Sequence, residues 1–451
     1  MKTLRFRRVF LLPQNYFCSM PIEKLYQLYK QHPQVQTDSR QLKAGDIFFA
    51  LKGENFNGNR FAKAALDNGA VAAVIDDATF FIDDRTILVE DVLTTLQALA
   101  KHHRQQFDIP FIAVTGSNGK TTSKELIHTV LAATFKTYTT KGNLNNHIGI
   151  PLTLLSIGFD AEIAVIEMGA NHQKEIEGYC QYVLPTHGVI TNCGKAHLEG
   201  FGGEEGVRKG KGELFDYLRS HNGTAFIFSD YDYLRDMSAG IPHVITYGTA
   251  GANYQGSLTK ADPHLAVAIE KTPTDAAALS ELSLIQTKLV GAYNLPNVLL
   301  AVAVGSHFKV APAKIKEAIE NYTPTNSRSQ LIQQGTNAVI LDAYNANPSS
   351  MKLAIENFAA IKANKKVLML GSMMELGDST EQEHLDIIKL IGKYNWENVV
   401  LVGGPFSNVK HNYISFPTAV EAADWFRQQQ FSDTHILIKG SRSMKMETIL
   451  N

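Results

Sequence analysis

Residues 115–122, TGSNGKTT, combine the residue types that hold the phosphates of a nucleotide. Gly116 and Gly119 allow a tight turn whose backbone N–H groups can face an anion, and the Lys120 ammonium adds a positive charge. Thr121 supplies a hydroxyl, which ligates magnesium in loops of this kind. These residue types in this order predict a loop that binds nucleotide phosphates together with a magnesium ion.

The flanking sequence supplies the elements that such a loop requires. Residues 111–114 form a short apolar run rich in β-branched and aromatic side chains, which predicts a buried strand. Residues 123–134 carry apolar side chains at helical spacing. The general pattern has Gly or Ala where Val114 stands, and a Gly-rich turn can be a plain strand-to-helix connection. The strand before the loop and the helix after it favour phosphate binding.

Two further residues with metal-binding side chains follow predicted strands. Glu167 comes directly after the predicted strand 163–166, and His197 follows the predicted strand 188–191. Parallel sheets bind ligands at the carboxyl ends of their strands, so both residues are expected beside the phosphate loop. A lone glutamate after a strand is usually a solvated loop acid, but the shared sheet edge favours metal ligation here.

The composition limits the class of protein. A chain of 451 residues is long enough for about three domains, and 44% hydrophobic with 19% charged residues is typical of a soluble globular protein. The formal net charge of -1 argues against a surface for nucleic acid or for an anionic membrane. The three cysteines lack paired spacing, which predicts neither disulfides nor a zinc site and fits a reducing cytoplasm. No apolar run reaches the roughly 18 residues of a membrane helix.

The first 19 residues are basic and then briefly apolar. Pro13 and Gln14 interrupt the apolar part, and no small-residue cleavage site follows, so a signal peptide is not predicted. We expect a poorly ordered extension, with Met20 as the more plausible start of the protein.

Strand and helix patterns alternate along the chain, which predicts an α/β fold in three domains. Residues 20–107 are expected to form a small N-terminal α/β domain, and residues 108–324 a central P-loop ATPase with a mostly parallel sheet. Short alternating runs over 253–290 predict added antiparallel hairpins. Residues 325–451 are expected to form a C-terminal, doubly wound, Rossmann-like domain, and the polar stretch 321–329 predicts a hinge before it.

Taken together, these stretches resemble the Mur ligase family, the ATP-dependent amide-bond ligases of peptidoglycan precursor synthesis. Besides TGSNGKTT, the resemblance rests on TDSR (37–40), GDIFFAL (45–51), GNLNNHIGIPLTLL (142–155), EMGA (167–170), AHLEGFG (196–202), KGELF (211–215), YNLPN (293–297), DAYNANP (342–348), LGSMMELG (370–377) and KGSRSMKME (439–447). Two stretches depart from the family's usual residues: Tyr293 replaces a histidine, and Ser327-Arg328-Ser329 replaces Gly-Arg-Leu.

The resemblance implies a reaction. ATP phosphorylates the terminal carboxylate of UDP-N-acetylmuramoyl-tripeptide, and D-alanyl-D-alanine attacks the acyl phosphate, with Mg²⁺ required. The enzyme is expected to be a monomer that binds neither nucleic acid nor membrane. One alternative is the related ligase that adds the third residue of the stem peptide, but its DNPR-like stretch is missing here. Another is a nucleotide-binding regulatory protein, which would be expected to lack Lys120, Glu167 or His197.

The resemblance also implies roles for individual residues. The expected catalytic residues are Lys120, Glu167, His197 and Lys211, and the expected metal ligands are Thr121, Glu167, His197 and Lys211. ATP is expected to contact Thr115, Gly116, Ser117, Asn118, Gly119, Lys120, Thr121, Thr122, Asn294, Asn297, Arg328 and Asp342. The other substrates are expected to contact Ser39, Arg40, Gly53, Asn145, Tyr344, Asn345, Asn347, Lys439, Ser441 and Arg442. For Ser39, Arg40 and Gly53 the sequence by itself favours turn and surface chemistry.

Lys211 lies on the predicted helix 204–218, fourteen residues after His197. A lysine on such a helix is by default a solvated surface charge. The resemblance implies instead that Lys211 is carbamylated by carbon dioxide, with neighbouring Lys209 the less favoured candidate. An unmodified ammonium would repel a second magnesium ion, whereas an anionic carbamate could ligate or orient it.

Overall fold

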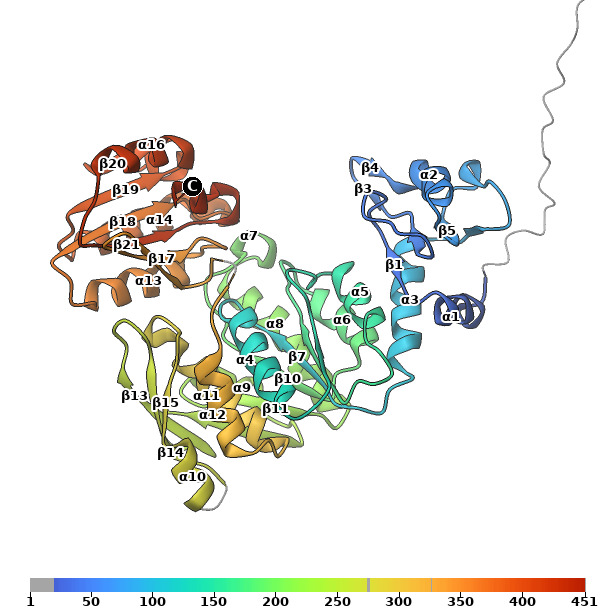
Figure 1. Ribbon diagram of the computed structural model, residues 1–451, viewed down its shortest axis with the longest axis horizontal. Coiled ribbons are helices and arrows are strands. Elements are labelled where there is room, and N and C mark those ends of the chain that lie inside the picture. Colours follow the sequence, from blue (N-terminus) through green and yellow to red (C-terminus); the bar gives the residue numbers. More distant parts are fainter. Residues whose placement is uncertain (1–19, 274–275, 326, 451) are drawn as a thin grey trace, which may run out of the picture. The chain divides into compact units, whose positions relative to one another are not determined.

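The structure is a computed structural model that describes residues 20–273, 276–325 and 327–450. The extension predicted for residues 1–19 lies outside the described residues. The chain forms two compact units (Figure 1). The first contains the residues up to Asp108 together with His147–Gly158, and the second contains Ile109–Asn146 and the chain from Phe159 onward.

The first unit is built on a parallel sheet, whose strand order in the described residues is β1-β2-β5-β6. Its core contains Phe48, Ala65, Ala73 and Ile75, which are buried between the sheet and a helix. The strands are β1 (Val35–Gln36), β2 (Ile47–Phe49), β5 (Ala72–Ile75) and β6 (Thr86–Leu88), with a separate hairpin of β3 (Lys52–Gly53) and β4 (Phe56–Asn57). The helices are α1 (Ile22–Gln31), α2 (Ala62–Asp67), α3 (Val92–Arg104) and α5 (Gly149–Leu155).

The predicted domain boundaries assign helix α5 to the central domain. In the structure this helix belongs to the first unit. It packs on α3, and its apolar residues Leu154 and Leu155 are buried. The Tyr29 hydroxyl donates to the Leu155 carbonyl at 2.5 Å, and the His103 ring lies 2.8 Å from the Ile157 carbonyl oxygen. The apolar side of this helix therefore completes the first unit, a long-range contact that local sequence patterns do not encode.

The second unit begins with a sheet that, over the described residues, has the order β15-β14-β13-β12-β11-β10-β7-β9-β8. Pairing is parallel from β8 to β13 and antiparallel from β13 to β15, which confirms both the mostly parallel sheet and the added hairpins. The strands are β7 (Phe111–Thr115), β8 (Thr137–Thr139), β9 (Ile163–Glu167), β10 (His187–Ile190), β11 (Thr224–Phe228), β12 (His243–Gly248), β13 (Tyr254–Lys260), β14 (Ala266–Lys271) and β15 (Leu284–Gln286).

Helices cover this sheet in packed groups. Helix α4 contacts α11 and α12, and α8 contacts α6 and α7. Residues Val298–Val304 of α11 are all buried. The helices are α4 (Lys120–Ala132), α6 (Glu175–Val183), α7 (Leu198–Phe201), α8 (Glu204–Ser220), α9 (Asp232–Met237), α10 (Ala276–Leu282), α11 (Leu295–His307) and α12 (Pro312–Asn321).

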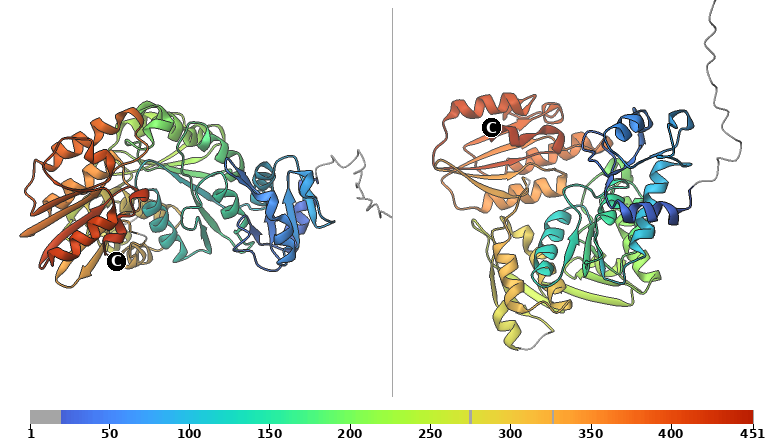
Figure 2. Two further views of the ribbon diagram at one scale, coloured as in Figure 1. Left: turned by 90° about the horizontal axis from the view of Figure 1, so that it is seen from above. Right: turned by 45° about the vertical axis from the view of Figure 1, so that its right-hand side comes forward.

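The C-terminal sheet of the second unit has the order β16-β17-β21-β18-β19-β20 among the described residues. All its pairs are parallel except β16 with β17, and helices flank it (Figure 2). Its inner strands are mostly apolar runs because both faces of the sheet are buried there. The elements are β16 (Gln330–Gln334), β17 (Asn337–Asp342), α13 (Pro348–Ala360), β18 (Lys365–Gly371), α14 (Thr380–Ile391), β19 (Asn398–Val402), α15 (Gly404–Ser407), β20 (Ile414–Phe416), α16 (Ala419–Gln429) and β21 (Thr434–Lys439).

This arrangement confirms the α/β class and the doubly wound C-terminal sheet. Among the described residues, no helix combines the length and the apolar character needed to cross a membrane.

Candidate active site

The loop between β7 and α4 has the geometry that the sequence predicts. Strand β7 ends at Thr115, and α4 begins at Lys120. Gly116 and Gly119 have φ angles of 140° and 79°, a region that side-chain-bearing residues rarely adopt. A Cβ atom on Gly116 would lie 2.0 Å from the Thr191 hydroxyl oxygen, so only glycine fits there. The N-terminus of α4 can therefore receive an anion.

Lys120 folds back onto this loop. Its Nζ donates to the Gly116 carbonyl at 2.6 Å and to the Ser117 carbonyl at 3.3 Å. Burial lowers the pKa of Lys120, while the Glu167 carboxylate acts in the opposite direction. A phosphate oxygen would be a stronger, charge-assisted partner than these two neutral carbonyls.

Glu167 ends β9, which is paired with β7, and its carboxylate lies beside the start of α4. The Thr121 hydroxyl donates to one carboxylate oxygen and the Asn145 amide to the other, each at 2.8 Å. Glu167 is only 1% exposed, and among the described residues no lysine or arginine forms an ion pair with it. A buried carboxylate held by neutral donors fits a site for a divalent cation.

His197 precedes α7 and has a φ of 53°. Its Nδ1 contacts the carboxylate of Glu375, which follows β18 in the C-terminal part of the unit. The hydrogen bond from His197 lowers the pKa of Glu375. No group of three His, Cys, Asp or Glu side chains in the described chain is arranged to hold a metal ion. Magnesium takes few protein ligands and keeps several waters, so the metal-binding role of Glu167 and His197 stays a prediction.

Lys211 on α8 is buried, with 1% exposure, and is not a solvated surface charge. Its Nζ donates to the Ala170 carbonyl at 2.9 Å and lies 4.8 Å from the centre of the Phe201 ring. Burial, with a smaller contribution from Lys120, lowers the pKa of Lys211 to about 7. Much of the Lys211 amine is therefore neutral near pH 7. The neighbouring Lys209, on the same helix, is exposed to solvent.

The predicted nucleotide residues of α11 are tied to the phosphate loop. Asn297 Oδ1 accepts from the Ser123 hydroxyl of α4 at 2.9 Å, and Asn297 Nδ2 donates to Asn294 Oδ1 at 2.8 Å. The Asn294 amide in turn donates to the Val290 carbonyl at 2.9 Å. Both asparagines are buried. The start of α11 is thus fixed relative to the start of α4.

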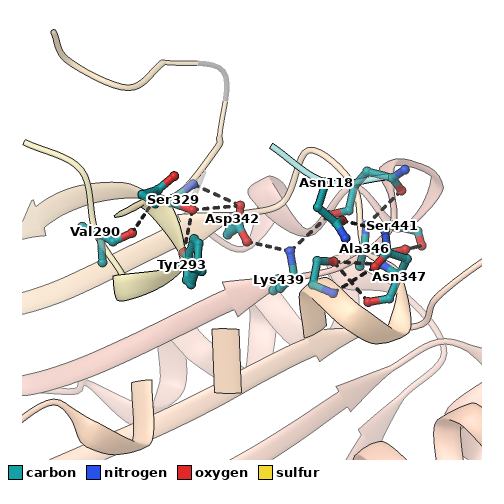
Figure 3. Close-up of polar contacts among 12 residues, drawn as sticks. Asn118, Val290, Tyr293, Ser329, Asp342, Ala346, Asn347, Lys439 and Ser441 are labelled. Atoms are coloured by element: carbon teal, nitrogen blue, oxygen red, sulfur yellow. Dashed lines mark hydrogen bonds and ion pairs between the residues drawn. The ribbon is translucent and has the colours of Figure 1, made fainter. Parts of the chain in front are cut away.

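The C-terminal candidates meet at the ends of β17 and β21 (Figure 3). Lys439 Nζ donates to Asp342 Oδ2 at 2.6 Å and to the Asn345 carbonyl at 3.2 Å. Ser441 Oγ donates to the Ala346 carbonyl at 3.3 Å. Asp342 and Lys439, predicted for different ligands, therefore neutralise each other in this structure.

The Tyr344 ring has two arginine neighbours. The Arg328 guanidinium is 3.7 Å from the centre of the Tyr344 ring and the Arg442 guanidinium is 5.5 Å from it. Both distances are within the range of a cation–π contact. Neighbouring Asn347 donates through Nδ2 to Asn118 Oδ1 of the phosphate loop at 2.8 Å.

A cavity of about 1170 Å³ joins these groups, which is large enough for a nucleotide with a second ligand. It is lined by the predicted residues Ser117, Asn118, Gly119, Lys120, Thr121, Thr122, Asn145, Glu167, His197, Asn294, Asn297, Arg328, Asp342, Tyr344, Asn345, Asn347, Lys439 and Arg442. Thr115, Gly116, Lys211 and Ser441 lie outside this lining. Sequence reasoning missed the lining residues Glu375, Tyr293 and Ser329 as site residues. Glu375 lies within the quoted LGSMMELG stretch, which is the one signal that could have identified it.

Ser39, Arg40 and Gly53 belong to the first unit and lie on its loops and hairpin. Arg40 and Gly53 are exposed, and Arg40 pairs with Asp38 at 2.8 Å. Hydrogen bonds from Arg40 hold the pKa of Asp38 well below its usual range. A role of these three residues in binding substrate stays a prediction.

Comparisons with known proteins agree over nearly the whole chain. Sequence models of the Mur ligase family match in three places: the catalytic domain at residues 33–104, the middle domain at 114–305, and the glutamate ligase domain at 327–442. The UDP-N-acetylmuramoyl-tripeptide--D-alanyl-D-alanine ligase of Bacillus subtilis is 34% identical over 434 residues, which is 92% of each chain. A crystal structure of MurF from Acinetobacter baumannii has a TM-score of 0.81 at 30% identity, covering 92% of each chain. The MurF ligase of Thermotoga maritima in complex with ADP also has a TM-score of 0.81, at 26% identity, covering 92% of this chain and 96% of that one.

Proposed function

Because this chain belongs to the Mur ligase family, we propose that it joins D-alanyl-D-alanine to UDP-N-acetylmuramoyl-tripeptide, using ATP. The products would be UDP-N-acetylmuramoyl-pentapeptide, ADP and phosphate. The name of the Bacillus subtilis relative and the ADP bound to the Thermotoga maritima structure support this assignment.

The observation that carries the proposal is the contact between Asn118 and Asn347. Asn118 belongs to the phosphate loop, and Asn347 belongs to the YNANP stretch predicted to bind the other substrates. Their hydrogen bond, and their shared place in the lining of one cavity, support a common location for the proposed phosphate and acceptor sites. A ligase that activates a carboxylate with ATP needs both sites within reach of the same atom.

The proposed chemistry has two steps. An oxygen of the tripeptide carboxylate attacks the γ-phosphorus of ATP, which forms an acyl phosphate and releases ADP. The amine of D-alanyl-D-alanine then attacks the acyl carbon, forms the amide bond, loses a proton and expels phosphate. Phosphoryl transfer depends mainly on positioning and charge neutralisation, and the Lys120 ammonium and the N–H groups at the start of α4 would supply both.

Thr121 and Glu167 would hold one magnesium ion, and His197 a second. The arrangement of a buried carboxylate without a cationic partner supports the first site. When bound, magnesium would neutralise charge on the phosphate oxygens. The Asn145 amide donates to the carboxylate oxygen of Glu167 that Thr121 does not contact. These two side chains therefore orient the carboxylate before any metal binds.

Lys211 is proposed to be carbamylated. Its burial beside the Ala170 carbonyl keeps the amine away from solvent, and a neutral amine is the form that can attack carbon dioxide. The neutral nitrogen forms a bond to the carbon of carbon dioxide and releases one proton, which converts a neutral amine into an anionic carbamate. The resulting carbamate would complete the charge of the metal site together with His197.

The rest of the assignment follows the domain prediction. We propose that residues 20–107 bind the UDP end of UDP-N-acetylmuramoyl-tripeptide, that residues 108–324 hold ATP, and that residues 325–451 supply the ligase residues. We also propose that the enzyme acts as a monomer. A cytoplasmic location is supported by Cys180 and Cys193, which are both free thiols.

The test is a substrate panel. Purified protein with ATP and magnesium is given UDP-muramoyl peptides of increasing length, and phosphate release is measured with D-alanyl-D-alanine, single amino acids or glutamate. The proposal predicts phosphate release only when the UDP-muramoyl tripeptide and D-alanyl-D-alanine are both present. Phosphate release with a UDP-muramoyl dipeptide and a diamino acid would instead identify the ligase that adds the third residue of the stem peptide.

A further inference from the structure

Four side chains form an unbroken polar line across the second unit (Figure 3). The Tyr293 and Ser329 hydroxyls share a hydrogen bond of 2.8 Å. Asp342 Oδ1 accepts from the Ser329 backbone N–H at 3.0 Å and from its hydroxyl at 3.4 Å. Asp342 Oδ2 accepts from Lys439 Nζ at 2.6 Å. Because the Ser329 hydroxyl donates to Asp342, the Tyr293 hydroxyl is the donor to Ser329.

The first contact joins two parts of the chain that lie far apart in the sequence. Tyr293 belongs to a short 3-10 turn, Ala292–Asn294, directly before α11. Ser329 directly precedes β16 in the segment that leads into the C-terminal sheet. Two side chains from distant parts of the sequence thus make one contact. Removing the Ser329 hydroxyl would take this partner from the Tyr293 hydroxyl, whereas removing the Tyr293 hydroxyl would leave Ser329 with Asp342.

The far end of the line is an ion pair in which the lysine is buried and the carboxylate is partly exposed. Lys439 is only 2% exposed, and Asp342 is the carboxylate that pairs with it. A buried ammonium is tolerated when it is paired and its other protons are satisfied. The second acceptor of Lys439 is the Asn345 carbonyl, at 3.2 Å. The line therefore ends on the backbone of the loop that we call the acceptor loop, residues 343–347.

The same segment holds the acceptor loop at a second point. The Tyr344 backbone N–H donates to the Ser327 carbonyl at 3.2 Å, two residues before Ser329. The position of the segment 327–329 therefore determines the position of the acceptor loop. The contact that ties this segment to the nucleotide side of the cavity is Tyr293 with Ser329.

We infer that Tyr293 and Ser329 are positioning residues, whose hydroxyl pair fixes the acceptor loop through Asp342 and Lys439. Neither hydroxyl need touch the reacting atoms. Their effect is to hold Tyr344, Asn345 and Asn347 where the incoming amine substrate binds. The identity of that substrate rests on the proposed function, whereas the mechanical coupling does not.

Hydrogen exchange in the ligand-free protein tests the coupling. Tyr293→Phe, Ser329→Ala and the double variant are compared with the parent for exchange in a peptide covering the acceptor loop. We expect each single variant to exchange about fivefold faster in this peptide, because each loses one net hydrogen bond. The double variant should exchange no faster than either single variant. Tyr138→Phe, which removes a tyrosine hydroxyl bonded to Asp160 at 2.7 Å at the β8 edge, is the matched control.

Steady-state kinetics with the same variants tests the positioning role. We expect the KM for D-alanyl-D-alanine to rise about fivefold, a larger change than that in kcat or in the Kd of a non-hydrolysable ATP analogue. Unchanged exchange in the single variants, or effects that multiply in the double variant, would overturn the inference. An equal fall in kcat, nucleotide affinity and melting temperature would also overturn it, because it would indicate general destabilisation. If the parent itself fails to use the dipeptide, the proposed function is wrong, and the exchange data still decide the coupling.

Discussion

The side chain of Asn347 donates to that of Asn118 at 2.8 Å, joining the acceptor loop to the phosphate loop. Asn118 is itself fixed, because its N–H donates to Asn192 and its carbonyl accepts from Thr191. Movement of the acceptor loop is therefore opposed by the residues that hold the predicted phosphate loop in place. A nucleotide that orders the phosphate loop would order the acceptor loop as well.

Asn347→Asp tests this link without disturbing the fold. Asn347 also caps α13 through Ser350, and aspartate is an equally good cap, so the melting temperature should change little. The new carboxylate cannot donate to Asn118 Oδ1, and the two oxygens would repel. We expect kcat/KM for the dipeptide to fall about tenfold or more, measured by phosphate release. Unaltered kcat/KM with intact structure would show that the link is incidental.

Lys120→Ala should abolish ligation and leave the fold intact. The variant removes the cation that would neutralise charge between the β- and γ-phosphates, a loss typically worth several kcal/mol of transition-state stabilisation. Turnover is measured by phosphate release and folding by circular dichroism. Lys136→Ala, an exposed lysine near Asp160, is the control and should keep parental activity. Turnover of Lys120→Ala within about threefold of the parent would contradict the phosphate-loop assignment.

Lys211→Ala should inactivate the enzyme, because the proposed carbamate would be lost from the metal site. Short-chain carboxylic acids could occupy the vacated space and restore part of the activity, as an anion in place of the carbamate. The exposed neighbour supplies the control: Lys209→Ala should behave like the parent. A Lys211→Ala variant as active as the parent, also in buffer depleted of carbon dioxide, would rule out the modification.

The stability of the second unit should fall on acidification because of His187. Burial, with a smaller effect of His307, lowers the pKa of His187 to about 4, against roughly 6.5 in an unfolded chain. Between these values the unfolded chain binds a proton that the folded protein does not. The free energy of unfolding should therefore fall by up to about 1.4 kcal/mol per pH unit as the pH drops from about 6.5 to about 4.

The measurement is the urea midpoint at several pH values for the parent and for His187→Gln. His187 packs against Phe226, His307 and Phe308, and its ring contacts the Thr186 hydroxyl. Glutamine does not titrate, so the variant should show a shallower pH dependence. Parallel curves for the two proteins would show that His187 does not contribute.

Local sequence patterns predict the elements that carry the chemistry. The strand at 111–114, the glycine turn and the following helix are local features, and the structure has β7, the loop and α4 there. Strand β16, QLIQQ, escaped prediction because it is mostly polar and gains its pairing from β17. The placement of α5 with the first unit likewise depends on burial against α3, which no local pattern encodes.

Side-chain partners were the hardest feature to predict. Sequence indicates that Asp342 and Lys439 belong to the site but not that they pair with each other, since 97 residues separate them. The burial of Lys211 depends on Phe201 and Ala170, which come together only in the folded unit. The contact of His197 with Glu375 also joins distant parts of the chain. Residue type and strand-end position thus predict membership of a site, whereas pairing requires the fold.

The most direct test of the central claim follows an oxygen atom. UDP-N-acetylmuramoyl-tripeptide labelled with ¹⁸O in its terminal carboxylate is incubated with ATP, magnesium and D-alanyl-D-alanine, and the product peptide and the phosphate are analysed by mass spectrometry. Ligation through an acyl phosphate predicts that each ATP consumed yields one pentapeptide and one phosphate. Each of these two products should carry a single ¹⁸O atom. Unlabelled phosphate, or ATP consumption without pentapeptide, would contradict it.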